Sequence, residues 1–340
     1  MKKLLIVTDT WDPKMDGIVR AIKHRTPVLM EKGLDVTVVH PGLFRSFPFF
    51  LYPEVRVAIL PRNRLRRLLK ETAPDYIHIE TEGTLGFAAR QLCRAQGLHF
   101  TSSYHTHLQL YADVYAGMPI KFLLKPAAWV LRWFHSAAVR TVVSTVTLKR
   151  ELERQGFKNL EVCPLGVDTE LFVRNPASDK GHGLQKPVFA FFSRVAPEKS
   201  PEDFLRLDLP GTKLVIGDGP ARKKLEHKYP NAKFVGFKHG QELVDWLSCV
   251  DVAVLPSRTE TFGLVVPEAL ACGIPVAAHN VMGPQDSITN GVDGVLSDDL
   301  RQAALDCLKI DRDKCREKAL KFSWASSAQE FARLLVPARG

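Results

Sequence analysis

Short apolar runs of strand length alternate with longer helix-patterned segments along nearly all of this 340-residue chain. Runs such as Leu4–Val7 and Val188–Phe192 are apolar at consecutive positions, not at every second one. A strand of that kind must be covered on both faces, and a parallel sheet flanked by helices supplies the cover. The alternation therefore predicts an α/β chain built on doubly wound parallel sheets.

The predicted strands form two sets. The first set contains Leu4–Val7, Val36–His40, Tyr76–Ile79, Phe100–Tyr104, Thr141–Ser144 and Glu161–Cys163. The second set contains Val188–Phe192, Lys213–Ile216, Phe234–Val235, Val252–Leu255 and Val276–Ala278. Helical periodicity marks the intervening segments, for example Ile18–Lys32 and Leu65–Lys70. We therefore expect two doubly wound, Rossmann-like domains that face each other across a cleft.

A polar stretch separates the two sets of strands. The stretch Asn175–Gly183 is rich in Pro, Gly and Ser, which is typical of a linker. We expect an N-terminal domain over residues 1–172, a linker over 173–187, a C-terminal domain over 188–322, and a C-terminal helix over 323–340 that returns to the N-terminal domain.

The composition excludes several classes of protein. Apolar residues make up 45% and charged residues 25% of the chain, which is typical of a globular protein and not of a disordered or coiled-coil one. The six cysteines form no CxxC pair, so buried thiols in a reducing cytosol are expected. No run of about 18 uncharged apolar residues occurs, so no membrane-spanning helix is expected. These features predict a cytoplasmic protein.

The positive charge is concentrated in the first half of the chain. Residues 1–170 carry 24 basic and 16 acidic side chains, whereas the remainder carries 23 and 21. A basic excess of this kind suits nucleic acid, an anionic membrane surface or a phosphorylated ligand, and composition does not choose among them.

Two segments of the second half carry residues suited to a nucleoside diphosphate. Arg194 and Lys199 lie five residues apart in a turn after a predicted strand, where a planar fork and a point charge could bind a diphosphate. Glu260 and Glu268 lie eight residues apart, and a carboxylate can accept hydrogen bonds from the vicinal hydroxyls of a sugar. Taken singly, the two cations could be solvated surface groups, and Glu268 could be a charge at a helix N-terminus.

Together with other motifs, these segments resemble the retaining nucleotide-sugar glycosyltransferases of family 4, which have the two-domain GT-B fold. The matching motifs are Asp16-Gly17-Ile18, Ser103 to His107, Pro164 to Phe172, Arg194 to Lys199, Ile216 to Pro220, Glu260 to Val276 and Gly283 to Ile288. Within the family, the resemblance is closest to α-mannosyltransferases and to enzymes that glycosylate membrane lipids such as diacylglycerol or phosphatidylinositol.

The resemblance implies that the N-terminal domain binds the acceptor and the C-terminal domain binds the nucleotide-sugar, and it implies roles for individual residues. Arg194 and Lys199 would bind the donor diphosphate, Glu268 the ribose and Glu260 the donor hexose, and His105 would lie near the transferred sugar. The donor site would also include Gly17, Phe237, Phe262, Gly263 and Leu264. The catalytic set is therefore predicted as His105, Arg194, Lys199 and Glu260, with no metal ion and no cofactor beyond the nucleotide-sugar co-substrate. From the residues alone, His105 and Phe237 could equally be structural.

Three features depart from simple patterns. Ser193 stands where the family usually has glycine, and Met282 replaces the first of a usual glycine pair, which leaves the donor sugar open. Gly217-Asp218-Gly219 is only a fragment of a dinucleotide-binding fingerprint, so it is not interpreted as an NAD site.

Apolar and basic side chains are mixed in two segments of the first half, Leu43–Tyr52 and Pro119–Phe134. Such a mixture predicts a peripheral contact with an anionic membrane, because apolar groups enter the interface while cations meet headgroups. The alternative is a core helix with a solvated basic face. The residues predicted for acceptor or membrane contact are Phe44, Arg45, Phe47, Arg66, Arg67, Lys121, Lys125 and Trp129.

The predicted function is retaining transfer of a hexose from GDP-mannose, UDP-glucose or UDP-glucuronate to an acceptor. The expected acceptor is a membrane lipid such as diacylglycerol or a phosphatidylinositol-type glycolipid. The protein would then act at the inner face of the cell membrane. A polysaccharide or lipopolysaccharide acceptor, a sugar-nucleotide epimerase and an inactive donor-binding subunit are the alternatives on the same fold. A basic nucleic-acid-binding protein is the alternative from another class, but no such signature appears and no nucleic-acid partner is expected.

Overall fold

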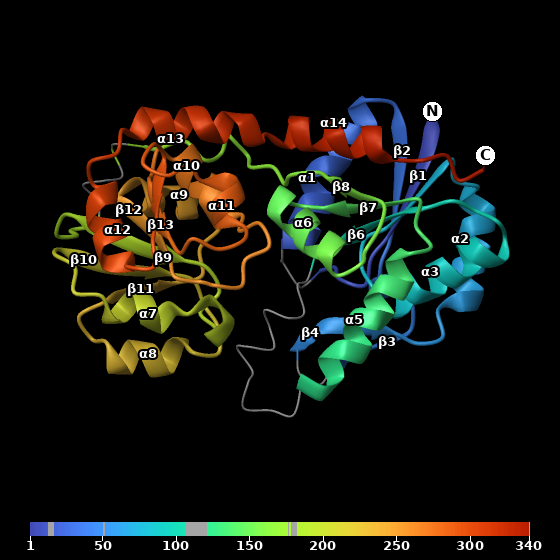
Figure 1. The fold of residues 1–340 in the computed structure, drawn as a ribbon, viewed down its shortest axis with the longest axis horizontal. Coiled ribbons are helices and arrows are strands. Elements are labelled where there is room, and N and C mark those ends of the chain that lie inside the picture. The colour runs from blue at the N-terminus through green and yellow to red at the C-terminus, as the bar shows by residue number, and fades with distance from the viewer. Residues whose placement is uncertain (13–16, 50–51, 106–120, 176, 178–181, 340) are drawn as a thin grey trace. The chain divides into compact units, whose positions relative to one another are not determined.

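The computed structural model describes residues 1–12, 17–49, 52–105, 121–175, 177 and 182–339. The chain divides into two compact units. The first contains the described residues up to Leu165 together with Trp324 onward, and the second contains Gly166–Ser323. Each unit has one main parallel sheet with helices on both faces (Figure 1). The predicted α/β class, with two Rossmann-like units, is confirmed.

In the first unit the main sheet has the strand order β2-β1-β5-β6-β7-β8, and every pairing is parallel. Its strands are β1 (Lys2–Val7), β2 (Leu34–Val39), β5 (Tyr76–Ile79), β6 (Thr101–Tyr104), β7 (Arg140–Val143) and β8 (Leu160–Val162). A separate antiparallel pair is formed by β3 (Ser46–Phe49) and β4 (Tyr52–Ala58). The helices are α1 (Gly17–Glu31), η1 (Pro41–Leu43), α2 (Arg62–Thr72), α3 (Thr84–Ala95), α5 (Lys121–His135), α6 (Val146–Arg154) and α14 (Trp324–Leu334).

The second unit repeats this plan with the strand order β11-β10-β9-β12-β13-β14, again all parallel. Its strands are β9 (Val188–Phe192), β10 (Thr212–Ile216), β11 (Lys233–Gly236), β12 (Val252–Leu255), β13 (Val276–Ala278) and β14 (Gly294–Leu296). The helices are η3 (Pro197–Lys199), α7 (Pro201–Arg206), α8 (Arg222–Lys228), α9 (Gly240–Ser248), α10 (Val265–Ala271), α11 (Pro284–Ser287), α12 (Leu300–Cys307), α13 (Arg312–Ala319) and η4 (Leu320–Phe322).

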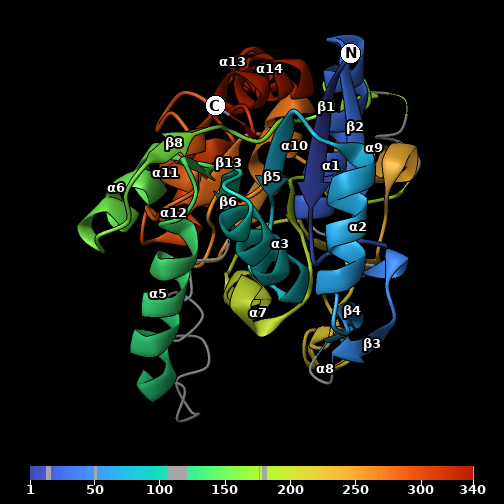
Figure 2. The same ribbon diagram turned by 90° about the vertical axis from the view of Figure 1, so that its right-hand side faces the viewer.

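The continuous apolar strands are explained by a separate core on each face of each sheet. Successive side chains of a strand point to opposite faces. In β9, Val188, Ala190 and Phe192 pack with α9, α10 and α13, whereas Phe189 and Phe191 pack with α7, α8 and α12. The first sheet is likewise covered by α2 and α3 on one face and by α1 and α14 on the other. Figure 2 views this unit from the side of α2 and α3.

The division between the units lies earlier in the chain than the sequence analysis placed it. Residues 166–172, assigned there to the N-terminal domain, belong to the second unit. Val167 and Phe172 are buried in the core that the second sheet forms with α10 and α13. The physical reason is that the chain passes from the first unit to the second at residue 166, before the segment packs into the second core. The composition of the segment does not reveal this change of unit. Helix α14 belongs to the first unit and packs against α1.

The stretch predicted as a linker, residues 173–187, therefore lies within the second unit and does not join the two units. The backbone N–H of Asn175 donates to Ser248 Oγ at 2.9 Å, and the ring of His182 stacks on Trp246 at 3.7 Å. Both partners lie on α9, so the stretch connects the crossing segment to β9. Residues 176 and 178–181 of this stretch lie outside the described residues.

All six cysteines are buried free thiols, as the sequence analysis expected. Burial raises the pKa of Cys93 to about 12, so this thiol carries no charge near neutral pH. In the described part of the chain, no helix has both the length and the apolar character needed to cross a bilayer.

Candidate active site

The order of strands in the second unit locates a binding edge. The chain starts at β9, adds β10 and β11 on one side, and then crosses to β12 on the other side. In an open parallel sheet, ligands bind beyond the carboxyl ends of the strands where the order reverses in this way. The loops that follow β9 and β12 are the two loops that carry Arg194, Lys199 and Glu260.

These two loops are joined by an ion pair between predicted site residues. Lys199 Nζ lies 2.6 Å from Glu260 Oε1, and Glu260 is buried. The hydroxyl of Thr259 donates to the backbone carbonyl of Glu198 at 2.8 Å, and that of Ser257 donates to the same oxygen at 3.2 Å. The loop after β9 is thus fastened to the loop after β12 by side chains adjacent to the charged pair.

Arg194 lies in the same loop but is exposed. The structure brings Lys199 and Glu260 into contact, and the side chain of Arg194 is exposed in the loop after β9. An exposed cation beside a buried pair is suited to an anionic ligand that arrives from solvent.

The remaining donor residues follow Glu260 into α10. Gly263 has φ +76° and packs against the side chain of Glu260, and Leu264 precedes the helix. Glu268 is buried in the first turn of α10, where the helix dipole favours a negative charge. The side chain of Phe262 is buried against Phe322 of η4, with 6.2 Å between the ring centroids, so it anchors the loop.

Two further loops lie against this edge. The ideal Cβ of Gly283, after β13, would be 3.0 Å from Glu260 Cβ, and its φ of +88° also disfavours a side chain, so glycine is favoured there. Phe237, after β11, is 65% exposed, and its ring stacks on His239 with 5.9 Å between the centroids. An exposed aromatic ring is available for stacking and is not a core residue.

The glycine pair Gly217 and Gly219 has a structural explanation. A Cβ on Gly217 would lie 2.0 Å from the carbonyl oxygen of Ser193, and one on Gly219 would lie 2.4 Å from that of Val195. The backbone N–H of Val195 also donates to the carbonyl of Asp218 at 2.9 Å. The two glycines thus let the loop after β10 pack directly on the backbone that carries Arg194.

The first unit has its own reversal of strand order, between β1 and β5, and His105 lies at this edge. His105 follows β6, is half-buried, and places its Nε2 atom 2.7 Å from Glu80 Oε1. Glu80 follows β5 and also contacts His78, at 2.8 Å between Oε2 and Nε2. Gly17 is the first residue of α1, and Asp16, Thr106 and His107 of the matching motifs lie outside the described residues.

Two acidic residues at this edge were missed by the sequence analysis. Glu80 is buried between two histidines, and the alternation of His78 and Glu80 at the end of an apolar strand was the available signal. Asp9 accepts hydrogen bonds from the backbone N–H groups of Leu85 at 2.7 Å and Gly86 at 3.1 Å, so it caps α3 from the loop after β1. Burial raises the pKa of Asp9, and these hydrogen bonds partly oppose that effect.

Comparison with known families identifies the chain. Residues 15–171 match the family described as Glycosyltransferase Family 4, and residues 186–310 match Glycosyl transferases group 1. The chain belongs to glycosyltransferase family 4. The first matched segment includes strands β2 to β8 of the first unit, and the second includes β9 to β14 of the second unit. The GT-B fold predicted from the sequence is confirmed.

Curated relatives of this glycosyltransferase agree with the family assignment, and a solved structure of another protein agrees with the fold. A GDP-mannose-dependent alpha-mannosyltransferase of Mycobacterium tuberculosis is 28% identical over 86% of this chain and 83% of its own length. A sulfoquinovosyl transferase of Arabidopsis thaliana is 31% identical over 78% of this chain and 57% of its own length. The solved sucrose-phosphate synthase of Thermosynechococcus elongatus superposes with a TM-score of 0.81 at 19% identity and covers 98% of both chains.

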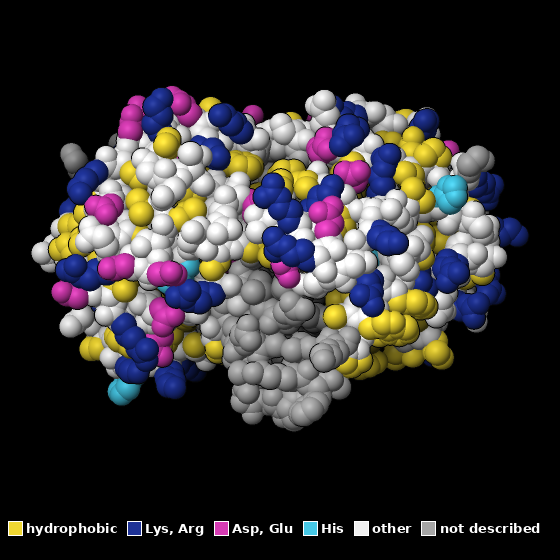
Figure 3. Space-filling view, in the orientation of Figure 1, with side chains coloured by type: hydrophobic (Ala, Val, Ile, Leu, Met, Phe, Trp, Pro, Cys, Tyr) yellow, Lys and Arg dark blue, Asp and Glu magenta, His cyan; other side chains and the backbone are white. Residues whose placement is uncertain are grey.

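The residues predicted for membrane contact in this glycosyltransferase share one unit. Arg45, Arg66 and Arg67 are exposed, Phe47 is 49% exposed, and Trp129 on α5 is 58% exposed. Figure 3 shows apolar side chains gathered where α5 and β3 lie, with Lys and Arg side chains beside them.

The same surface is not uniformly exposed. Phe44 is half-buried, with the guanidinium of Arg64 5.5 Å from its ring centroid, and Phe134 at the end of α5 is buried in the core. Helix α5 therefore packs into the core through Phe134 at its end and exposes Trp129 to solvent. The side chains of Lys121 and Lys125 lie outside the described residues.

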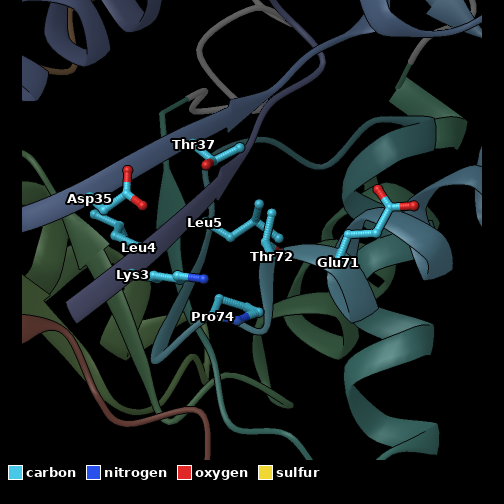
Figure 4. A pocket seen from close by; sticks show the side chains of 8 residues that line it. All are labelled: Lys3, Leu4, Leu5, Asp35, Thr37, Glu71, Thr72 and Pro74. Atoms are coloured by element: carbon cyan, nitrogen blue, oxygen red, sulfur yellow. The ribbon is translucent and has the colours of Figure 1, made fainter. Parts of the chain in front are cut away.

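Two other features carry no site. A pocket beside β1 is lined by Lys3, Leu4, Leu5, Asp35, Thr37, Glu71, Thr72 and Pro74, and it holds none of the predicted site residues (Figure 4).

The sequence also contains an Asp-x-Asp pair, Asp311 and Asp313, which was not considered when no metal ion was expected. The side chain of Asp311 accepts from the Asp313 backbone N–H at 2.9 Å, as a helix cap does. Among the described residues, no group of three or more His, Cys, Asp or Glu side chains is arranged to hold a metal ion.

Proposed function

We propose that this glycosyltransferase transfers a hexose from a nucleoside-diphosphate sugar to a membrane-lipid acceptor, with retention of anomeric configuration and without a metal ion. The observation that carries the proposal is the contact between Lys199 and Glu260, which joins the loops of two family motifs at the switch point of the second sheet. The donor is assigned to this edge, and the acceptor to the first unit.

The chemistry requires stabilisation of a leaving diphosphate. When the hexose departs, negative charge grows on the β-phosphate oxygen while the anomeric carbon becomes oxocarbenium-like. Arg194 and Lys199 offer positive charge to that oxygen, and preorganised charge of this kind accounts for much of catalysis in transfer reactions. The departing phosphate takes the proton of the acceptor hydroxyl, which attacks the face that the diphosphate leaves. The configuration is thereby retained.

GDP-mannose is the first donor to test, because several relatives are named as GDP-mannose-dependent mannosyltransferases. A lipid acceptor is favoured because another relative, 24% identical over 96% of this chain, is named alpha-monoglucosyldiacylglycerol synthase. The test incubates the protein with a lipid extract and GDP-mannose, UDP-glucose or UDP-glucuronate in separate reactions, and measures lipid masses. A gain of one hexose supports the proposal. Transfer of the hexose to an added polysaccharide and not to any lipid would refute the lipid acceptor. A reaction that releases no nucleotide would refute it as well.

Glu268 gives a prediction for donor binding. The variant Glu268→Ala is expected to raise the KM for the donor by about tenfold to a hundredfold, because a hydrogen bond to a charged group contributes about 1.5–3 kcal/mol. Titration of the nucleotide alone, by calorimetry, measures the same loss without the acceptor. Because Glu268 is buried, the melting temperature of each preparation must be recorded, and Glu268→Gln serves as the isosteric comparison. Unchanged nucleotide affinity in both variants would remove Glu268 from the site.

Peripheral membrane contact is proposed for the surface that contains Phe47, Arg66, Arg67 and Trp129. The double variant Arg66→Ser/Arg67→Ser is expected to weaken binding to phosphatidylglycerol-containing vesicles about tenfold or more, since each cation near an anionic surface contributes about 1 kcal/mol. Vesicle sedimentation measures the binding, and pure phosphatidylcholine vesicles show the charge dependence.

The matched control removes two exposed lysines of the second unit, Lys223→Ser/Lys224→Ser, and leaves vesicle binding unchanged. If the two double variants lose vesicle binding equally, net charge is responsible and the assigned surface is wrong. The variant Trp129→Ser tests the apolar part of the same surface and is expected to weaken binding to both kinds of vesicle.

A further inference from the structure

A buried chain of polar side chains ends at His105. It begins on β6, where Thr101 Oγ1 lies 2.8 Å from His78 Nδ1 and Ser103 Oγ lies 2.9 Å from His78 Nε2. His78 Nε2 lies 2.8 Å from Glu80 Oε2, and the other oxygen of Glu80 lies 2.7 Å from His105 Nε2. Thr101, Ser103, His78 and Glu80 are all buried, whereas the side chain of His105 is 17% exposed. This series of side-chain contacts therefore runs from the sheet interior to the accessible edge.

The carboxylate of Glu80, at the centre of this series of contacts, is ionised. Burial by itself would raise the pKa of Glu80, but the electrostatic interaction with His78 and the hydrogen bond and charge of His105 outweigh burial and hold that pKa well below its ordinary value. An ionised carboxylate only accepts hydrogen bonds. The Nε2 atom of His105 must therefore carry a proton and donate it to Glu80, which fixes the orientation of the His105 ring.

The same contact affects the charge of His105. Burial disfavours the protonated ring, but the hydrogen bond and charge of Glu80 prevail and raise the pKa of His105 above its ordinary 6.5. Among the other charged groups that act on the ring, Glu82 raises this pKa further and Arg25 lowers it. A ring with protons on both nitrogens offers only donors, which suits a phosphate oxygen or a sugar hydroxyl oxygen and does not suit a general base.

We propose that Glu80 is a positioning residue that holds His105 in its donor form for hexose transfer, an inference that rests on the proposed function. His78 contacts Glu80 in turn, and Thr101 and Ser103 hold the ring of His78. His105 then contributes a fixed hydrogen-bond donor to the reaction, and Glu80 acts only through it.

The test compares the pH profile of hexose transfer in the unaltered protein and in Glu80→Gln. Because the protonated ring is required, kcat/KM falls as pH rises through the pKa of His105. The glutamine keeps the volume and one acceptor but removes the charge, so the falling limb moves to lower pH. At pH 8, kcat/KM is expected to drop about tenfold or more, the range for loss of a hydrogen bond to a charged group.

A matched control exists on the same sheet edge. Glu82 Oε1 accepts from the buried His135 at 2.9 Å, with the same carboxylate-to-imidazole geometry. Glu82 acts on His105 only through space, so Glu82→Gln is expected to move the falling limb less than Glu80→Gln does. Equal displacement in the two variants would show a general electrostatic effect and overturn the proposal.

A double-mutant cycle separates positioning from a merely structural role. In the His105→Ala background, Glu80→Gln is expected to cause no further loss of transfer, because its effect passes through the missing ring. An additional loss of the same size in that background would refute the proposal. If Glu80→Gln does not fold, NMR titration of His105 in the unaltered protein remains decisive, and a pKa at or below the ordinary value overturns the proposal.

The outcomes also separate this proposal from the proposed function. Hexose transfer with a pH profile that Glu80→Gln leaves unmoved would refute the role of Glu80 and leave the transferase intact. A raised pKa of His105 that depends on Glu80, in a protein that transfers no hexose to any acceptor, would refute the transferase instead.

Discussion

Replacing Arg194 with alanine is expected to lower the kcat of hexose transfer by about 100-fold or more while leaving the fold intact. Arg194 is an exposed residue of the loop after β9, so its replacement is expected to change stability by only about 0.5 kcal/mol, as for other surface substitutions. The loss of activity is larger because a preorganised charge at the leaving oxygen contributes about 2.7–4 kcal/mol to the transition state. Initial rates at saturating donor measure this loss directly.

The control for Arg194 is another exposed arginine of the same unit. Arg206 lies at the end of α7 and pairs with Glu202 at 3.2 Å. The variant Arg206→Ala removes the same charge from the second unit and is expected to keep transfer within about twofold, since surface ion pairs contribute little. A rate for Arg194→Ala that equals that of Arg206→Ala would mean that the diphosphate binds elsewhere.

A larger effect on stability is expected from Gly217→Ala. The added Cβ would lie 2.0 Å from the carbonyl oxygen of Ser193, and the φ of +148° already disfavours a side chain. The loop that carries Arg194 must shift, and overpacking of backbone against backbone is expected to cost about 3 kcal/mol or more. Chemical unfolding followed by fluorescence measures this loss, and donor affinity should fall in the same variant.

Gly291→Ala separates steric clash from backbone strain. Gly291 has φ +79° with nothing within 4 Å of its ideal Cβ, so alanine there experiences only the left-handed backbone. That strain costs about 1–2 kcal/mol. If Gly217→Ala proved no less stable than Gly291→Ala, the packing of the two loops would not be the reason for the glycine.

Most of the fold was predictable because the strands are buried on both faces. Val188–Phe192, Val252–Leu255 and Val276–Ala278 were placed with their observed bounds, since two cores demand consecutive apolar residues. The strand Gly294–Leu296 was missed because three residues that include a glycine give no periodic signal. The β3 and β4 pair was missed for a related reason, since β3 contains Pro48 and lies apart from the main sheet.

The candidate site was predictable only where it consists of contiguous motifs. Arg194, Lys199 and Glu260 were selected on the motifs of their own loops, and the observed contact between Lys199 and Glu260 agrees with their grouping. Glu80 belongs to no motif, because its partners lie two residues before it and 25 residues after it, on neighbouring strands. Its role depends on the pairing of β5 with β6.

The amino-acid sequence by itself determined the local features of the protein. These are which segments are strands, which loops carry charge, and where glycine is required. Only the tertiary structure decided which charges meet, that residues 166–172 join the second unit, and that Glu80 binds two histidines. The physical reason is that strand identity follows from the burial of each side chain in turn. Contact between distant side chains follows instead from the order in which the strands pair, and residue patterns alone do not state that order.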